Sequence, residues 1–389
     1  MERTELKAWL RLTLAPGIGN ETARKLLTAF GSAPAIFEQS AEALRQLGSE
    51  KLCRIVREEP VTLTAQLQTT LEWLAAGDDR HLVTLGDADY PPGLLNIEDP
   101  PLMLYMLGIH AQRGPRALQD TAGNIAIVGS RNPTPQGEVN ARQFAKAFAG
   151  AGLCVVSGLA LGIDGAAHDG ALLAGAASSG CATIAVVGTG LDRVYPKKHL
   201  ALAHRTAQQG LLISEFPLGT PPLMSNFPRR NRLISGLSQG VLVVEAALKS
   251  GSLITARLAS EQGKEVFAIP GSIHSPQSRG CHALIKQGAK LVETAQDVFE
   301  ELRIPTKQLA GRLATPHLDQ ENEPFDPVEG HAADQVLLLA LGFDVTSLDA
   351  LQARTGLPTA QLQGQLLELE LDGHVARLPG GLFQRLAAS

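Results

Sequence analysis

The sequence predicts an α/β fold built on an extended, Rossmann-like, doubly wound parallel sheet. Between residues 123 and 303, short aliphatic runs rich in β-branched residues alternate with alanine-rich helical segments. The runs are continuously apolar, which indicates strands that helices cover on both faces. Glycines and small residues follow several of these runs, where the ligand of such a sheet binds. The expected strands are 125–128, 153–156, 183–187, 211–213, 241–244 and 266–269, and the expected helices are 136–150, 165–177, 197–209 and 251–262.

The chain divides into four expected parts. Leucines at helical spacing run through the first part. Prolines and acidic residues crowd the third part, which has too little apolar surface to order itself. The fourth part reads as three helices and a glycine-tipped hairpin, similar to a winged helix. The parts are a small helical domain at 1–75, the Rossmann-like domain at 76–303, a disordered acidic linker at 304–332 and the winged-helix unit at 333–389.

A turn at 15–25 in the helical domain has the pattern of a helix-hairpin-helix. Its glycines leave backbone amides free near a helix N-terminus, where a phosphate can bind. The alternative is an ordinary turn between bundled helices, with Asn20 as the N-cap. Because the pattern occurs in a single copy, the ordinary turn is favoured over direct DNA contact.

Composition limits the classes of function. The chain has 389 residues and a formal net charge of −5, so generic adherence to duplex DNA through bulk positive charge is not expected. The winged-helix unit carries three basic and six acidic residues, which favours a protein contact or a regulatory role over a grip on duplex DNA. The sequence shows no signal peptide and no apolar run of membrane length, so a cytoplasmic protein without a membrane partner is expected.

Neither a metal nor a cofactor is expected. The four cysteines are isolated, and none has zinc spacing with a histidine pair. No G-x-G-x-x-G follows a strand and no G-x-x-x-x-G-K-[ST] occurs, which argues against bound NAD and against P-loop ATP hydrolysis. The cysteines are Cys53, Cys154, Cys181 and Cys281.

A cationic run lies at 226–238. Three arginines fall within four positions there, and no acidic residue occurs between Glu215 and Glu245. Arginine forks match phosphate oxygens and an aromatic face can stack a base, so the run predicts a focused anionic site. The alternatives are an exposed helix start with ordinary surface arginines and a Phe227 that only anchors its loop. The candidate residues are Asn226, Phe227, Arg229, Arg230, Asn231 and Arg232.

The three arginines of this run cannot all face one ligand. On a helix, Arg229 and Arg232 share a face because they are three positions apart, and Arg230 then points elsewhere. We therefore expect at least one of them to be structural, paired with Glu215 or Glu245.

Further candidates stand at the carboxyl ends of the expected strands. Gly129, Ser130 and Arg131 follow the first strand, and Arg131 is expected to contact phosphate, with a structural ion pair as the alternative. Lys197 and Lys198 follow a later strand, where they extend a cationic groove or simply begin a solvated helix.

A third group precedes another helix and suits a phosphate, although its glycine can also serve helix–sheet packing. Two polar residues between these segments are expected to be structural: His168 as a satisfied core histidine and Asp164 as a helix cap. The third group consists of Ser250, Gly251 and Ser252.

The central domain, over about residues 80–303, closely resembles the bacterial DNA-processing protein A family, also called Smf. Family members often carry an N-terminal helical domain similar to a sterile-alpha-motif fold, and some carry a C-terminal winged helix. The motifs that carry the resemblance are Val128-Gly129-Ser130-Arg131, 157–164 with Ala167-His168, 188–192 with Tyr195-Pro196, Ser214-Glu215 with Pro217, 226–238, 250–256 and Pro270-Gly271-Ser272.

The resemblance implies a non-enzymatic single-stranded DNA-binding protein. It implies that the protein protects incoming strands during natural transformation, helps to load the RecA recombinase, and acts as a homodimer through its Rossmann-like domain. Arg229 stands at the variable position of the arginine motif. The DNA-binding residues that the resemblance implies are Gly129, Ser130, Arg131, Asn226, Phe227, Pro228, Arg230, Asn231 and Arg232.

Two other functions remain open. One is a Rossmann-like hydrolase of nucleotide phosphates, for which Glu245, Asp164 and Arg131 can supply the acidic residue and the arginine; the density of arginines at 226–232 favours a polyanion instead. The other is a transcription regulator that reads duplex DNA through its winged helix, against which the acidic balance of that unit argues.

Overall fold

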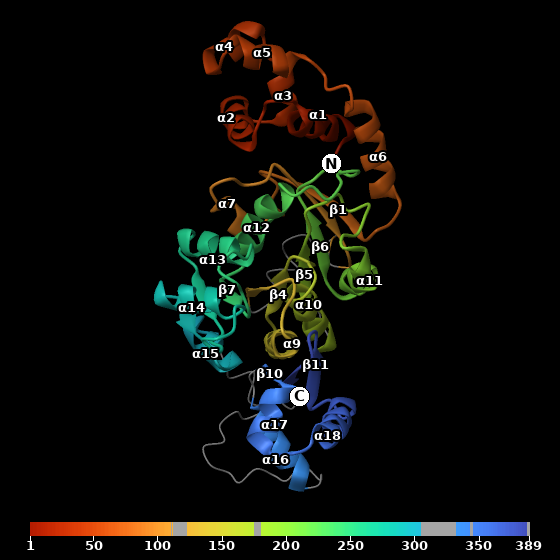
Figure 1. Ribbon diagram of the computed structural model, residues 1–389. Coiled ribbons are helices and arrows are strands. Elements are labelled where there is room, and N and C mark those ends of the chain that lie inside the picture. Colours follow the sequence, from red (N-terminus) through yellow and green to blue (C-terminus); the bar gives the residue numbers. More distant parts are fainter. Residues whose placement is uncertain (110, 112–122, 175–179, 305–331, 343–344, 387–389) are drawn as a thin grey trace.

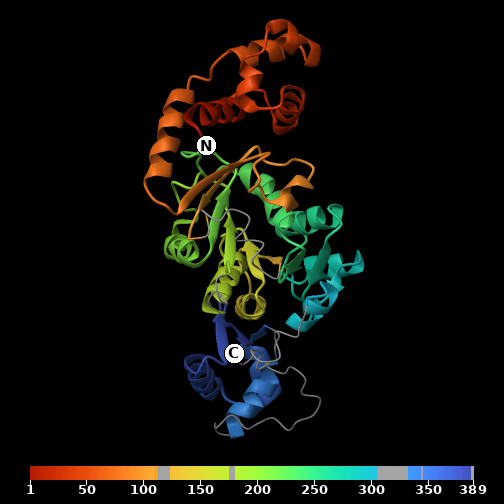
Figure 2. The ribbon, with the colours of Figure 1, turned by 180° about the vertical axis from the view of Figure 1, so that it is seen from behind.

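The structure, a computed structural model, describes residues 1–109, 111, 123–174, 180–304, 332–342 and 345–386 (Figure 1). Helices lie at one end of the molecule, an α/β domain lies in the middle, and a small unit of helices and strands lies at the other end (Figures 1 and 2). The predicted linker at 304–332 falls outside the described residues except for its two end positions.

In the described part of the central domain, nine strands form one sheet. Their order is β1-β2-β6-β5-β4-β3-β7-β8-β9, and the pairings from β6 to β9 are parallel. The six predicted strands are present as β3 to β8. The strands are β1 (Arg80–Thr84), β2 (Met103–Leu107), β3 (Asn124–Val128), β4 (Cys154–Ser157), β5 (Thr183–Val186), β6 (Leu211–Ser214), β7 (Gly240–Val243), β8 (Glu265–Ala268) and β9 (Lys290–Leu291).

Helices cover both faces of this sheet, which confirms the doubly wound fold. Alternate residues of β3 point to opposite faces. Ile125 and Ile127 pack in one buried cluster with α9, α10 and α15, whereas Ala126 and Val128 pack in another with α12, α13 and α14. The helices are α9 (Pro135–Gly150), α10 (Ile163–Ala174), α11 (Leu200–Gln209), α12 (Asn226–Leu237), α13 (Ser252–Glu261), α14 (Arg279–Lys286) and α15 (Ala295–Glu301).

The N-terminal part is helical, as predicted. Its second helix begins at Asn20 and has Gly19 as its N-cap, so Asn20 does not cap it. The side-chain amide of Asn20 instead donates to Asp99 at 2.9 Å. The helices are α1 (Arg3–Leu14), α2 (Asn20–Phe30), α3 (Ala33–Phe37), α4 (Ala41–Leu47), α5 (Glu50–Arg57) and α6 (Leu63–Ala75).

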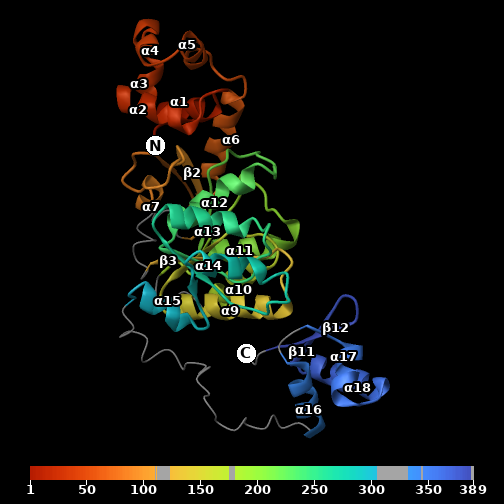
Figure 3. The ribbon, with the colours of Figure 1, turned by 60° about the vertical axis from the view of Figure 1, so that its left-hand side comes forward.

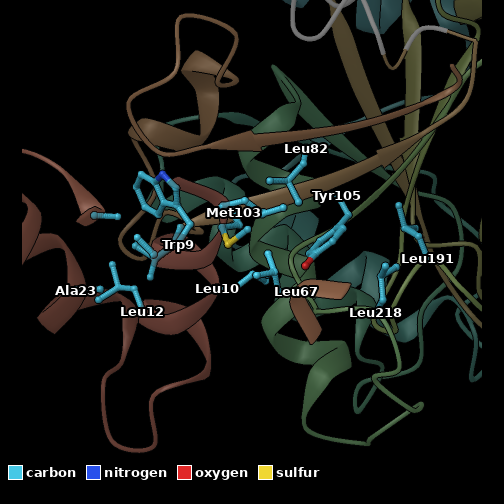
Figure 4. Packing of buried hydrophobic residues seen from close by; sticks show 14 of the residues in the cluster. Trp9, Leu10, Leu12, Ala23, Leu67, Leu82, Met103, Tyr105, Leu191 and Leu218 are labelled. Atoms are coloured by element: carbon cyan, nitrogen blue, oxygen red, sulfur yellow. The ribbon is translucent and has the colours of Figure 1, made fainter. Parts of the chain in front are cut away.

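One buried cluster joins these helices to the antiparallel edge of the sheet (Figure 4). Leu10 of α1 and Leu67 of α6 pack with Met103 and Tyr105 of β2. The rings of Trp73 and Tyr105 meet edge to face, with centroids 5.9 Å apart. The N-terminal helices and the sheet edge therefore share a hydrophobic core.

The C-terminal unit has its own core, built from leucines of three helices and Phe383 of a hairpin. Its strands form a small antiparallel sheet in the order β10-β12-β11. This is the winged-helix arrangement that the sequence predicts. Its elements are α16 (Ala332–Leu341), β10 (Thr346–Ser347), α17 (Leu348–Thr355), α18 (Thr359–Leu371), β11 (Val375–Leu378) and β12 (Leu382–Arg385).

Among the described residues, no helix combines the length and the apolar character needed to cross a bilayer.

Candidate functional site

Two segments that are far apart in the sequence meet at the carboxyl edge of the sheet. Arg131 follows β3, and its guanidinium carbon lies 5.4 Å from the centre of the Phe227 ring, in the first turn of α12. The ring of Tyr195, from the loop after β5, stacks at a tilt against the Phe227 ring, and the two ring centroids lie 5.7 Å apart. Arg131 and Tyr195 are exposed and Phe227 is half-buried. We call these three residues the cation–aromatic cluster.

Glycine and asparagine seat Phe227 against the loop that follows β5. A Cβ added at Gly188 would lie 3.1 Å from the Phe227 ring, so glycine allows the ring to approach the backbone. The buried side-chain amide of Asn226 donates to the carbonyl of Gly188 at 3.0 Å. Asn226 therefore fixes the start of α12, where the half-buried Phe227 ring packs against this loop.

The turn after β3 presents only one of its three predicted site residues. A Cβ on Gly129 would lie 2.7 Å from Ile163. The backbone N–H of buried Ser130 donates to the carbonyl of Glu245 at 2.7 Å, and its hydroxyl accepts from Asn132 at 3.1 Å. Gly129 and Ser130 thus shape the turn, and Arg131 projects from it.

Arg230 is predicted as a contact residue, but the structure buries it. Its guanidinium donates to the backbone carbonyls of Gly158 and Val186, at the ends of β4 and β5. A Cβ on Gly158 would lie only 2.1 Å from Nη1, so this glycine makes room for the arginine. Burial lowers the pKa of Arg230 to about 10, against the opposing effect of Asp164. Arg230 holds two strand ends together beneath the edge.

Arg232 is also an internal partner. Its side chain is 11% exposed and pairs with Glu215, which is 5% exposed, and more distantly with Asp99 at 3.7 Å. This confirms the expectation that at least one of the three arginines is structural and pairs with Glu215 or Glu245. Glu245, the other expected partner, accepts instead from the backbone N–H and hydroxyl of Thr134, at 2.9 and 2.6 Å.

The remaining predicted cations stay at the surface. Arg229 is 55% exposed, lies 3.9 Å from Glu215 and covers the ring of Phe216 at 5.6 Å. Lys197 and Lys198 are exposed on a 3-10 turn that precedes α11, two and three residues after Tyr195. Among the described residues, neither lysine nor Arg131 has a carboxylate within salt-bridge distance.

Figure 3 shows α13 beside α12, and the serine–glycine segment directly precedes α13. The hydroxyls of Ser250 and Ser252 lie 2.7 Å apart and hydrogen-bond to each other. Asn231 donates to the carbonyl of Gly251 at 3.3 Å, which ties this segment to the second turn of α12. Asn231 is therefore a link between two helices.

The two carboxylates of the hydrolase alternative, Asp164 and Glu245, accept hydrogen bonds from backbone N–H groups. Buried Asp164 accepts from the N–H of Ala160 at 3.3 Å, and burial raises its pKa. Burial likewise raises the pKa of Glu245, which holds Thr134 at the start of α9. His168 bonds the hydroxyl of Thr183 through Nδ1 at 2.7 Å in the core, and burial lowers its pKa to about 3. It is a core histidine as predicted, but only half satisfied, because its Nε2 is buried without a hydrogen-bond partner among the described residues.

Two residues of this region were not among the predicted site residues. Tyr195 follows a glycine-rich strand end, and this position in the sequence could have identified it as a site residue. Asp99 gave no signal, because its partners come from a different part of the chain. In the ranges described, no group of three or more His, Cys, Asp or Glu side chains could hold a metal ion.

Comparisons with known proteins agree with this architecture. The family model for DNA recombination-mediator protein A matches residues 81–303, and the model for the DprA winged helix domain matches residues 321–381. Protein Smf of Escherichia coli (strain K12) is 44% identical over 319 residues, which are 81% of this chain and 80% of that protein. DNA processing protein DprA of Bacillus subtilis (strain 168) is 43% identical over 220 residues, 57% of this chain and 70% of that protein.

Among solved structures, the X-ray structure of DNA processing protein A (DprA) from Streptococcus pneumoniae superposes with a TM-score of 0.61 and 34% identity. The match covers 77% of this chain and 98% of that one. These findings confirm the resemblance read from the motifs and the winged helix at the C-terminal end. The chain belongs to the DNA recombination-mediator protein A family.

Proposed function

We propose that the cation–aromatic cluster binds single-stranded DNA. The observation that carries this proposal is the placement of Arg131 over Phe227 at an exposed edge of the sheet. A guanidinium beside an aromatic face offers a partner for a phosphate and a stacking surface for a base. Bases of an unpaired strand have free faces to stack, so the cluster suits a single strand.

The distribution of charge supports a backbone path past the cluster. Arg229 is exposed two residues after Phe227, and Lys197 and Lys198 are exposed shortly after Tyr195. These cations are concentrated at one edge of a chain whose net charge is −5. Binding is then local and electrostatic, and it falls as salt concentration rises.

The predicted site residues take two roles in this proposal. Arg131, Phe227, Arg229, Lys197 and Lys198 contact the strand, together with Tyr195. The others shape the site from beneath. These are Gly129, Ser130, Asn226, Arg230, Asn231, Arg232, Ser250, Gly251 and Ser252.

We further propose that the protein protects incoming DNA in the cytoplasm during transformation, passes the strand to RecA, and acts as a homodimer without catalysis. Membership in a family of recombination mediators supports this role. The engagement of Asp164 and Glu245 with backbone groups favours binding over hydrolysis. The acidic balance of residues 333–389 favours a protein contact for the winged helix.

Fluorescence anisotropy with a labelled oligothymidine tests the DNA proposal. The protein should bind the oligothymidine at low salt and a duplex of equal length more weakly. Arg131→Ala should weaken binding to oligothymidine and to mixed-sequence single strands alike. Arg45→Ala removes the same charge from an exposed pair with Glu50 in the N-terminal helices and serves as the control. Absence of binding at low salt would overturn the proposal.

A further inference from the structure

A chain of alternating charges connects the N-terminal helices to α12. It begins at Asp99, whose two carboxylate oxygens accept from Arg24 and Asn20 of α2, each at 2.9 Å. The same carboxylate lies 3.7 Å from Nη2 of Arg232 in α12. Asp99 therefore stands between the two parts of the molecule.

The chain continues from Arg232 to the surface. Nη2 of Arg232 also pairs with buried Glu215, and Glu215 lies 3.9 Å from Nη2 of Arg229. We call Arg24, Asp99, Arg232, Glu215 and Arg229 the charge relay. It holds three arginines and two carboxylates, so one positive charge (3 − 2 = +1) is in excess.

The excess positive charge lies at the Arg229 end of the relay, next to the proposed DNA-binding site. Arg229 is 55% exposed, whereas Arg232 is 11% exposed and Glu215 is 5% exposed. A carboxylate buried to that extent must keep a cationic partner, because an unpaired buried charge is strongly destabilising. As long as Arg232 neutralises Glu215, Arg229 is free to face solvent.

The other end of the relay is fixed in position. Arg24 also donates to the carbonyls of Glu98, at 3.3 Å, and Pro100, at 3.4 Å, on either side of Asp99. The helix that carries Arg24 belongs to the domain whose core is continuous with the sheet edge. The N-terminal helices therefore hold Asp99 at a set distance from Arg232.

We propose that Asp99 is a positioning residue through which the N-terminal helical domain controls the availability of Arg229, and thereby the affinity for single-stranded DNA. This inference rests on the proposed function of the site. Asp99 and Glu215 compete for Arg232. When Arg24 satisfies Asp99, Arg232 stays with Glu215. When Arg24 is absent, Asp99 draws Arg232 away, Glu215 recruits Arg229, and Arg229 leaves the DNA.

The first experiment measures oligothymidine affinity of Arg24→Ala by anisotropy. The relay predicts a loss of roughly three- to tenfold, within the range of couplings between linked residues. Lys25→Ala is the matched control, because Lys25 follows Arg24 on the same helix but makes an exposed pair with Glu21. It should leave the affinity unchanged. An equal loss in both variants would show a generic charge effect and overturn the relay.

Two double variants separate the relay from a structural role. Arg24→Ala/Asp99→Asn should recover wild-type affinity, because the competing carboxylate is gone. Arg24→Ala should have no further effect in an Arg229→Ala background. If Asp99→Asn fails to rescue, or if Arg24→Ala weakens binding equally in both backgrounds, Arg24 does not act through Arg229 and the relay is wrong.

A measurement without DNA distinguishes failure of the relay from failure of the proposed function. Arg24 and Glu215 are linked only through Asp99 and Arg232 in the relay, so the thermal shifts of Arg24→Ala and Glu215→Gln should not add in the double variant. Additive shifts would overturn the relay. If the wild-type protein fails to bind oligothymidine while the shifts are non-additive, the charge coupling stands and the DNA function fails.

Discussion

Gly158 and Arg230 fit together so closely that a single methyl group cannot be placed between them. The guanidinium of Arg230 donates to the carbonyl of Gly158, and a Cβ on that glycine would lie 2.1 Å from Nη1. This contact joins the end of β4 to the helix that carries Phe227. The buried arginine and the glycine are therefore one structural unit beneath the cation–aromatic cluster.

Gly158→Ala should destabilise the protein, because the new methyl group displaces the Arg230 guanidinium from its two carbonyls. The expected loss is about 1–3 kcal/mol in the free energy of unfolding, as for overpacking in a core. Urea denaturation measures it. Gly150→Ala is the control, since no atom lies within 4 Å of a Cβ added at the end of α9. A stability of Gly158→Ala equal to that of the wild type would contradict the unit.

Phe227→Leu should weaken single-stranded DNA binding and leave the fold intact, because the half-buried ring lies at the surface between exposed Arg131 and Tyr195, where the proposal places a base. Loss of one base–aromatic stack costs about 1–3 kcal/mol of binding free energy. Anisotropy on thymidine and adenine oligomers checks this, with a similar loss expected for both. Unchanged affinity would remove Phe227 from the binding surface.

Substitution of both Lys197 and Lys198 by alanine should lower the affinity for single-stranded DNA more at low salt than at high salt. The dependence of the affinity on salt concentration should therefore become weaker. Each phosphate contact on a single strand contributes about 0.7 to the slope of log K against log salt, so the slope should fall by about 1.4 if both lysines neutralise phosphates. A titration from low to high salt gives the slope. An unchanged slope would mean that both lysines are solvated away from the strand.

Arg232→Ala should be severely destabilising, because it leaves Glu215 buried without its closest cation. Removal of one partner from a buried ion pair costs about 3–5 kcal/mol of stability. Arg257→Ala breaks an exposed pair with Glu261 at 3.5 Å on α13 and should cost no more than about 1 kcal/mol. Chemical denaturation of the two variants compares the costs, and similar values would argue against burial of the Arg232 pair.

Acid should destabilise the protein partly through His168. The pKa of this buried histidine is lowered from 6.5 to about 3, so the unfolded chain binds a proton that the folded chain does not. Its contribution is complete above pH 6.5 and is lost as the pH falls from there toward 3. The slope approaches about 1.4 kcal/mol per pH unit.

Denaturation curves measured between pH 7 and 5 check this dependence. His168→Asn keeps a group that can bond Thr183 and should flatten the pH dependence, whatever its effect on absolute stability. His204→Asn changes an exposed histidine on α11 and should leave the dependence as it is. Equal slopes in wild type and His168→Asn would show that other groups account for the acid sensitivity.

The sequence predicted the sheet because its six central strands contain short, continuous apolar runs, and β4 to β7 are buried along their whole length. β1, with Arg80 and His81, and β9, with two exposed residues, lack that signal because they lie at the sheet edges. The meeting of Arg131 and Phe227 was predictable as well. Each residue lies in a connection that begins at the carboxyl end of a parallel strand, and these ends share the sheet edge at which ligands bind.

The different roles of the three arginines were only partly predictable. Helical spacing indicates that Arg230 points away from Arg229 and Arg232. Its partners are backbone carbonyls, however, and these cannot be recognised from the sequence. The glycine at 158 is the one local trace of that contact. Asp99 could not be foreseen, because its role depends on how the N-terminal helices sit against α12.

The hydrophobic cluster that includes Leu67, Met103 and Tyr105 has a practical consequence for dissecting the protein. Cutting the chain near residue 76 would remove the helices that pack on the antiparallel edge of the sheet and would expose its apolar side chains to water. Precipitation or early melting of such a shortened protein would then reflect the loss of this packing. It should not be taken as evidence that the first helices touch the nucleic acid.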